Sequence, residues 1–131
     1  MKPTKGISVD GGCSGNPGLA YYRAVDIETG KELFRFNIGM ATNNIAEFLG
    51  LCNAIYYVKQ NNSAEPIYTD SKTAMAWVKN KKAKSSFSEP SINNRIKMAE
   101  DYLKTIKDID IRKWETKLWE EEIPADFGLK K

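Results

Sequence analysis

The sequence contains no histidine, and this absence limits its chemistry more than any other feature. Mechanisms that need an imidazole base are excluded, and so are metal sites built from histidine ligands. A metal ion bound by this chain has to be a hard cation held by oxygen atoms.

Cysteine and long apolar segments are also scarce. The pattern puts Cys13 in a turn and Cys52 on the buried face of a helix, which does not make a disulfide framework. No apolar run is long enough to cross a bilayer, and no signal peptide precedes the first predicted strand. We therefore expect a reduced, cytoplasmic compartment, no membrane contact and a monomer.

The overall composition is that of an ordinary globular chain. With 131 residues, of which 41% are hydrophobic and 28% charged, we expect one domain over 1–131. The net charge is only +3, so local clustering of charge matters more than the total. The densest basic cluster is either a solvated helix end or a surface that follows phosphates, and it consists of Lys79, Lys81, Lys82 and Lys84.

Hydrophobic periodicity predicts the element order βββαβααβα. A period of two indicates strands over 7–10, 19–27, 31–40, 66–70 and 109–114. A period of 3.6 indicates helices that begin at Asn44, at Ser71 and around Pro90, and a short terminal helix is expected from Pro124. The short links between the first three strands predict an antiparallel meander, and the whole order predicts a mixed sheet with helices packed on it.

The stretch from Ile7 to Gly18 is the most informative part of the chain. It starts as a β-branched run, reaches Asp10, and is then predicted to break into a glycine-rich loop. Such a loop can present backbone N–H groups at close range to a ligand. The alternative is a plain hairpin turn with a solvated aspartate.

Four carboxylates lie at or near predicted element ends, namely Asp10, Glu47, Asp70 and Asp126. Three of them have an alternative role in a helix cap: Glu47 in a capping box with Asn44, and the two later aspartates at helix N-termini. Taken together they favour a site, because ligands of α/β sheets gather at the carboxyl ends of strands. Four acids brought together repel one another unless a cation joins them.

Several motifs resemble those of ribonuclease H, type 1, in order and spacing. They are Asp-Gly-Gly-Cys-Ser-Gly-Asn-Pro-Gly at 10–18, Thr-Asn-Asn-Ile-Ala-Glu at 42–47, Thr-Asp-Ser at 69–71 and Ala-Asp-Phe-Gly at 125–128. The segments 77–86 and 114–128 are similar to the bacillus-like bacterial branch of this family, which lacks the active-site histidine. The resemblance covers nearly the whole chain.

The resemblance implies both a fold and a reaction. The fold is a five-stranded mixed sheet with helices on both faces, in which strands one to three are antiparallel and strands four and five run parallel to the first. The reaction is endonucleolytic hydrolysis of the RNA strand of an RNA–DNA hybrid, which leaves 5′-phosphate and 3′-hydroxyl ends.

The family mechanism also implies roles for the four acids. Two Mg²⁺ ions, with Mn²⁺ as a substitute, would clamp the scissile phosphate at a separation of about 4 Å. Asp10 would bridge the ions, and Asp70 and Asp126 would complete their separate shells. Glu47 would bind one ion and accept a hydrogen bond from the 2′-hydroxyl next to the cut.

A fifth acid is expected to take the place of the missing histidine in product release. Glu122 lies four residues before Asp126, as does a mobile glutamate of the bacillus-like branch. The segment before it is one residue longer than in that branch, so Glu121 is the alternative. Glu122 could also be a solvated member of an acidic run.

Recognition of the hybrid is expected from amides, which both donate and accept hydrogen bonds. The resemblance assigns Asn16, Asn43 and Asn44 to its minor groove, with backbone contacts from Cys13 and Gly15. Where the family commonly has glutamine this chain has Lys72, for which a phosphate contact is expected. A second pocket, for a DNA-strand phosphate, would contain Thr42 beside Asn43, with further residues from two later segments. These later residues are Ser85, Ser86 and Thr116.

Three other functions compete with this interpretation. One is a binding module with an inert site, and another is a nuclease of the same superfold that cuts DNA. The third is a protein unrelated to nucleic acids, whose acids are all helix caps. The tryptophans Trp77, Trp114 and Trp119 are expected to pack in the core or at a sheet edge rather than to stack on bases.

Overall fold

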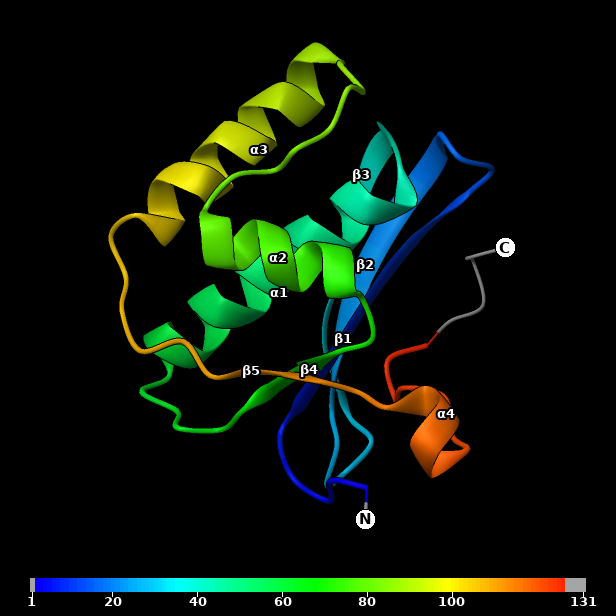
Figure 1. The fold of residues 1–131 in the computed structure, drawn as a ribbon, viewed down its shortest axis with the longest axis vertical. Helices are drawn as coiled ribbons and strands as arrows, with labels where there is room; N and C mark the ends of the chain where they lie inside the picture. Colours follow the sequence, from blue (N-terminus) through cyan, green and yellow to red (C-terminus); the bar gives the residue numbers. More distant parts are fainter. Residues whose placement is uncertain (1, 127–131) are drawn as a thin grey trace.

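The computed structural model describes residues 2–126, and the elements within that range are labelled in Figure 1. They follow one another as β1 (Ile7–Ser14), β2 (Gly18–Asp26), β3 (Glu32–Ala41), α1 (Asn43–Gln60), β4 (Ile67–Thr69), α2 (Lys72–Asn80), α3 (Pro90–Leu103), β5 (Ile111–Lys113) and α4 (Thr116–Trp119). Of the helices formed by the described residues, none has both the length and the apolar character needed to span a bilayer.

The strands form one mixed sheet in the order β3-β2-β1-β4-β5. β2 pairs antiparallel with both β1 and β3, whereas β4 pairs parallel with β1 and with β5. This topology confirms the predicted five-stranded mixed sheet. β4 and β5 are only three residues long, shorter than the periodicity indicated.

The glycine-rich stretch after Asp10 is strand rather than the predicted loop. β1 continues through residues 11–14, which pair with β2, and the turn is confined to 15–17 with a cis peptide bond before Pro17. Glycine in a strand often marks a place where another element approaches closely, and here α1 does so. Cys13, predicted in the turn, is a buried strand residue, and both cysteines are free thiols.

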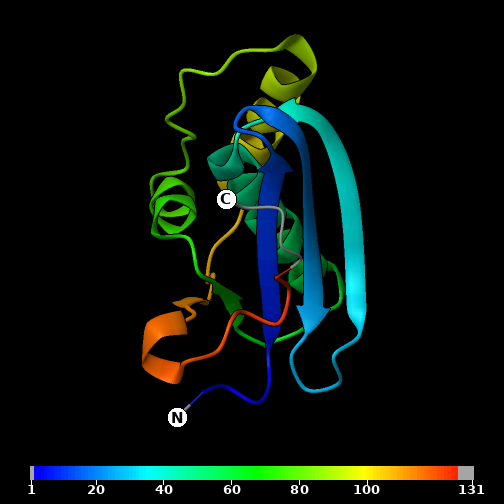
Figure 2. The ribbon, with the colours of Figure 1, turned by 90° about the vertical axis from the view of Figure 1, so that its right-hand side faces the viewer.

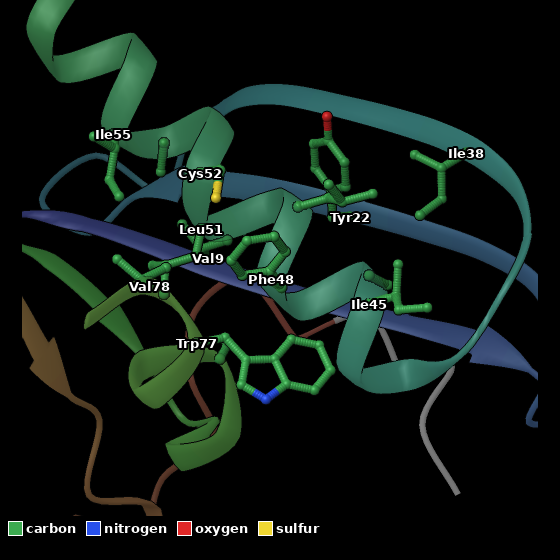
Figure 3. Packing of buried hydrophobic residues seen from close by; sticks show 14 of the residues in the cluster. Val9, Tyr22, Ile38, Ile45, Phe48, Leu51, Cys52, Ile55, Trp77 and Val78 are labelled. Atoms are coloured by element: carbon green, nitrogen blue, oxygen red, sulfur yellow. The ribbon is translucent and has the colours of Figure 1, made fainter. Parts of the chain in front are cut away.

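α1 is the centre of the main core and starts one residue before the predicted Asn44. Thr42 caps it, because its Oγ1 accepts a hydrogen bond from the N–H of Ile45 at 3.2 Å. Figure 3 shows the buried face of α1 between β1 and α2, with Phe48 close to Trp77. Their ring centroids are 5.8 Å apart at an interplanar angle of 69°, so Trp77 is a core residue as predicted.

α2 and α3 begin where the sequence indicated. Ser71 caps α2 by accepting from the N–H of Ala74 at 3.0 Å, and Glu89 caps α3 with Pro90 in its first turn. Both helices pack with α1 on one face of the sheet, and their buried residues belong to the main core. Along the chain, α1 connects β3 to β4, and α2 and α3 connect β4 to β5.

The other face of the sheet carries a small second cluster and the C-terminal segment. Figure 2 looks onto this face: the last described residues, in red, run in front of β1, and α1 lies behind it. Trp114 is the centre of the cluster, with its ring 6.1 Å from that of Tyr68 in β4 and 5.0 Å from that of Trp119 in α4. In the described residues, α4 is thus the helix that meets the prediction of helices on both faces.

The pattern gave no sign of α4, which has only four residues. The terminal helix predicted from Pro124 lies largely outside the described residues. Within them, residues 124–125 form a turn that the N–H of Asp126 closes onto the carbonyl of Ile123 at 2.9 Å.

Candidate active site

Three carboxylates from separate elements meet at the centre of the sheet. Asp10 comes from β1, Glu47 from α1 and Asp70 from the residue after β4, and each offers an oxygen within 4.8 Å of the others. Asp10 is 1% exposed and Glu47 5% exposed, whereas Asp70 is partly exposed. Buried acids that converge from separate elements are typical of functional sites, so the group is a candidate site.

The short β4 strand creates the opening at which two of these acids meet. β4 pairs with β1 only at Ile7 and Ser8, so the edge of β1 beyond Ser8 is not covered by a strand. The sequence predicted Asp10 at the end of the first strand. Because β1 continues to Ser14, Asp10 lies within the strand instead. Asp70 stands at the carboxyl end of β4, next to the uncovered edge, as expected for ligand sites in α/β sheets.

Gly11 lets Glu47 reach the same place. A Cβ atom at position 11 would lie 2.6 Å from the main-chain carbon of Ala46 and 2.7 Å from the nitrogen of Glu47. Only a residue without a side chain allows the first turns of α1 to approach β1 so closely. The helix position of Glu47 and the strand position of Asp10 thereby become neighbours.

The helix-cap alternatives are wrong for two of the acids. Thr42 caps α1, so Glu47 is not in a capping box with Asn44, and Ser71 rather than Asp70 caps α2. Neither acid is therefore explained by helix capping.

The donor set of the cluster fits a hard divalent cation. Two unit charges at about 4 Å repel by roughly 4 kcal/mol at an effective dielectric constant of about 20. Three carboxylates are gathered here, two of them buried, and a divalent cation between them would remove that repulsion. Carboxylate oxygens suit Mg²⁺, Mn²⁺ or Ca²⁺, and no histidine competes for softer metals.

Asp126 does not belong to the group of three within the described residues, although the sequence predicted four acids together. It is exposed and is the last residue that the structure describes. Its main chain is nevertheless held beside the site. Its carbonyl accepts a hydrogen bond from Arg23 Nη2 at 2.8 Å, and Arg23 is the cross-strand partner of Asp10.

Glu122 and Asp70 line one cavity of about 490 Å³. The rest of its lining is polar and consists of Lys72, Lys113, Glu115, Thr116 and Lys117. Glu121 points elsewhere: its carboxylate pairs with Lys2, and it lines a different cavity. Of the two alternatives left open by the sequence, Glu122 is the one that shares a cavity with Asp70.

The asparagines near the turn after β1 form a connected network. The N–H of Cys13 donates to Asn43 Oδ1 at 2.9 Å, and the N–H of Asn43 donates to Asn16 Oδ1 at 3.0 Å. Both amide oxygens thus hold the turn against the start of α1. The amide nitrogen of each side chain points away from the hydrogen bond that its oxygen accepts. Gly15, with φ of +83°, and the exposed Asn44 complete this edge.

The residues predicted for the DNA-strand pocket come from three segments. Thr42 caps α1, and Thr116 is the first residue of α4. Ser85 and Ser86 are exposed in the link between α2 and α3, where Ser85 Oγ accepts from the N–H of Phe87 at 3.2 Å. A shared pocket therefore stays a prediction for these residues. The four lysines of the basic cluster are all exposed, near the end of α2.

Sequence reasoning missed one residue at the site, Arg23. The available signal was a charge among apolar residues in a strand, at 23 between Tyr22 and Ala24. Once the hairpin is drawn with its turn at 15–17, the register sets this arginine opposite Asp10. The predicted loop after Asp10 concealed that pairing.

Comparison with known proteins agrees with this geometry. The family model for RNase H matches residues 4–115. A ribonuclease H from Rickettsia felis is 35% identical over 118 residues, which cover 82% of this chain and 75% of that protein. The chain belongs to the ribonuclease H family. It is therefore a member of a family of hydrolytic nucleases, as the motifs implied.

Solved structures show that the fold is that of type 1 ribonucleases H. RNase H1 from Halobacterium salinarum superposes with a TM-score of 0.58 at 22% identity, covering 89% of each chain. The N-terminal RNase H domain of a Mycobacterium tuberculosis protein gives 0.54 at 22% identity, covering 86% of this chain and 88% of that one. LC11-RNase H1, solved in complex with an RNA/DNA hybrid, gives 0.53 at 23% identity and 82% coverage of each.

Proposed function

We propose that this chain is an endonuclease that hydrolyses the RNA strand of RNA–DNA hybrids with the help of divalent cations. The observation that carries the proposal is the convergence of Asp10, Glu47 and Asp70 from three elements within 4.8 Å. Membership of the ribonuclease H family supports the substrate. Asp126 is proposed as the fourth ligand, from the segment that Arg23 holds beside Asp10.

The proposed cofactor is a pair of Mg²⁺ ions, for which Mn²⁺ can substitute. When bound, such a pair activates the attacking water and stabilises the leaving 3′-oxygen, so that 5′-phosphate and 3′-hydroxyl ends result. Asp10, the most buried of the acids, would hold the ions together with Glu47, Asp70 and Asp126. No side-chain base is required, which agrees with a chain that lacks histidine.

Discrimination of RNA from DNA is assigned to the asparagine edge. Asn16 and Asn43 use their oxygens to hold the turn, so their amide nitrogens are the groups that donate to the hybrid's minor groove. Asn44 and the main chain of Cys13 and Gly15 would add contacts there. Glu47 would accept a hydrogen bond from the 2′-hydroxyl beside the cut.

The DNA strand is proposed to bind through its phosphates. Thr42, Ser85, Ser86 and Thr116 supply hydroxyl groups for this purpose. Lys72 lies in the cavity that Asp70 lines, where an ammonium group suits a phosphate. Because these contacts reach the backbone rather than the bases, we expect little sequence specificity.

Glu122 is proposed to assist product release from the cavity that it shares with Asp70. The single catalytic domain over 1–131, the monomeric state, the cytoplasmic location and the place in the bacillus-like branch stay predictions.

The decisive experiment compares four substrates of one sequence: an RNA–DNA hybrid, an RNA duplex, a DNA duplex and single-stranded RNA. With MgCl₂ the protein is expected to cut the RNA strand of the hybrid alone and to leave 5′-phosphate ends. EDTA and the variant Asp10→Asn should each stop the cleavage. Equal cutting of the DNA duplex would favour a DNA nuclease, and hybrid binding without cleavage would favour an inert binding module.

A further inference from the structure

Arg23 is a largely buried cation next to the candidate active site. It lies in the middle of β2, directly opposite Asp10 of β1, so the two side chains share one face of the sheet. Its side chain is only 19% exposed. A guanidinium group so far from water requires hydrogen-bond acceptors to compensate its desolvation.

Two of the acceptors of Arg23 are successive main-chain carbonyls of the C-terminal segment. Nε donates to the oxygen of Ala125 at 2.7 Å, and Nη2 donates to the oxygen of Asp126 at 2.8 Å. A planar guanidinium offers its donors in a fixed fork, so two such bonds fix both the place and the direction of the peptide. The Cα atom of Asp126 is thereby fixed as well.

Glu32 keeps the fork of Arg23 in place. Its Oε2 accepts from Arg23 Nη1 at 3.0 Å and from Arg35 Nη2 at 3.0 Å, so the two arginines share one carboxylate. This connects β3 to the C-terminal segment through the side chain of Arg23. The guanidinium is held on one side by an acid and on the other by the segment.

The segment before Asp126 is anchored at two buried residues, Ile123 and Ala125. Ile123 is buried in the small cluster around Trp114, and one turn hydrogen bond joins Asp126 N–H to the carbonyl of Ile123. Two residues separate Ile123 from Asp126, so burial of Ile123 does not by itself fix where the Asp126 carboxylate stands. The two bonds from Arg23 act directly at that position.

We propose that Arg23 is a positioning residue of the active site, which holds the main chain of Ala125 and Asp126 against β1 and so sets where the Asp126 carboxylate stands. The proposal rests on the proposed function, because it gives Asp126 the role of a ligand. A cation facing Asp10 also lowers the electrostatic cost of gathering the acids before a metal ion binds.

The test replaces Arg23 with methionine, which keeps the length of the side chain, and with lysine, which keeps its charge. The control is Arg112→Met, since Arg112 is also a strand arginine paired with an acid, Asp110. In Arg23→Met we expect kcat on the hybrid to fall about 10–100-fold, as for residues that orient metal ligands. The Mg²⁺ concentration for half-maximal activity should rise, and the KM for the hybrid should stay unchanged.

Arg23→Lys should give intermediate values, because an ammonium group can reach one carbonyl but cannot grip two in the fork geometry. Arg112→Met should match the wild type in all these quantities. A measurement that does not depend on catalysis is the exchange rate of the Asp126 amide proton in the metal-free protein, followed by NMR. It should increase in Arg23→Met, increase less in Arg23→Lys and stay unchanged in Arg112→Met.

The outcomes separate the two proposals. If the wild type does not cleave the hybrid, the proposed function fails and the catalytic purpose of Arg23 fails with it. If the wild type cleaves it but Arg23→Met keeps the wild-type kcat and Mg²⁺ dependence, only the role of Arg23 is overturned, whatever the amide exchange shows. If Arg23→Met does not fold, Arg23→Lys decides, and wild-type activity and exchange in that variant overturn the inference.

Discussion

The acids at the centre of the sheet and the acid near the C-terminus are held in different ways. Asp10 and Glu47 are buried within elements that pack in the main core, with α1 pressed onto β1. Asp126 comes from the segment after α4, which is attached through Trp114, Ile123 and the side chain of Arg23. One part of the site is therefore built by the fold itself, and the other is added by a few specific contacts.

This difference has a consequence for how the site works. Moving Asp10 or Glu47 requires the main core to rearrange, and close-packed interiors resist that. Moving Asp126 involves the small cluster around Trp114 and the two hydrogen bonds from Arg23 rather than the main core, which corresponds to a local opening of lower free energy. We therefore expect that displacing Asp10 or Glu47 lowers global stability, whereas displacing Asp126 lowers it much less.

The largest effect is expected from neutralising one acid of each part. Asp10→Asn and Asp126→Asn should each lower hybrid cleavage by on the order of 10²–10³-fold or more, the loss typical of a preorganised electrostatic contact. Their stabilities without metal should differ. Asp10→Asn should raise the melting temperature because it relieves repulsion in a buried group, and Asp126→Asn should leave it unchanged because Asp126 is exposed. Equal melting temperatures for the two variants would contradict the comparison.

A methyl group at Gly11 should damage the central part in both respects. Gly11→Ala puts a Cβ 2.6 Å from the main chain of Ala46, so we expect a loss of about 1–3 kcal/mol and lower activity as Glu47 moves away from Asp10. The control is Gly30→Ala, where φ is +77° and space is open, at a cost of about 1 kcal/mol. Chemical unfolding and cleavage assays below the melting temperature check both. Full activity in a folded Gly11→Ala variant would be the contrary result.

Truncation of one isoleucine in each part should separate stability from activity. Ile55→Ala in the main core should cost about 2–5 kcal/mol of global stability while the folded fraction stays active. Ile123→Ala should cost less globally, because its cluster can open locally, but should lower activity more by releasing the Asp126 segment. Denaturant titrations and cleavage rates at low temperature give the two quantities. The comparison is wrong if activity follows global stability equally in both variants.

A smaller effect is expected for the acids before Asp126. Glu122→Gln should reduce multiple-turnover cleavage several-fold and leave the single-turnover rate nearly unchanged, because Glu122 lines the cavity of Asp70 and is assigned to product release. Glu121→Gln should have no effect, since that residue pairs with Lys2 on another side. Unchanged turnover in Glu122→Gln would remove that residue from the site.

The smallest effect should come from Glu32. Hydrogen bonds from Arg35 and Arg23 hold the pKa of Glu32 below its ordinary value of 4.5. Its contribution to stability is thus fully present above 4.5 and is lost as the pH falls through the lower pKa of the folded state. The stability difference between wild type and Glu32→Gln should therefore vanish in acid, as urea titrations at several pH values can show. A difference that persists in acid would mean that the ion pairs do not cause it. The difference should be small at any pH, because the side chain is 38% exposed and solvent screens the ion pairs.

Much of the central part could be predicted from the sequence. The change of period after residue 42 located α1, the Ser71 cap located α2, and the spacing of Asp10, Glu47 and Asp70 suggested their convergence. These predictions hold because they depend on local patterns and on a hydrophobic face that has one way to be buried.

The parts that were missed depend on contacts between distant residues. Glycines after Asp10 suggested a loop because glycine lacks local preference for a strand, and the approach of α1 explains why Gly11 stands in β1. α4 is too short for a periodic signal, and it forms where Trp119 packs on Trp114. Arg23 could be assigned only after the hairpin register placed it opposite Asp10.

The most direct test of the central claim is whether the acids at the centre of the sheet bind a divalent cation. Thermal unfolding should be measured for wild type and Asp10→Asn in EDTA and in increasing MgCl₂, with NaCl added to keep ionic strength constant. Ligands that bind only the folded state raise the melting temperature in a saturable manner. We predict such a rise for the wild type and little or none for Asp10→Asn. The same rise in both proteins would contradict the account.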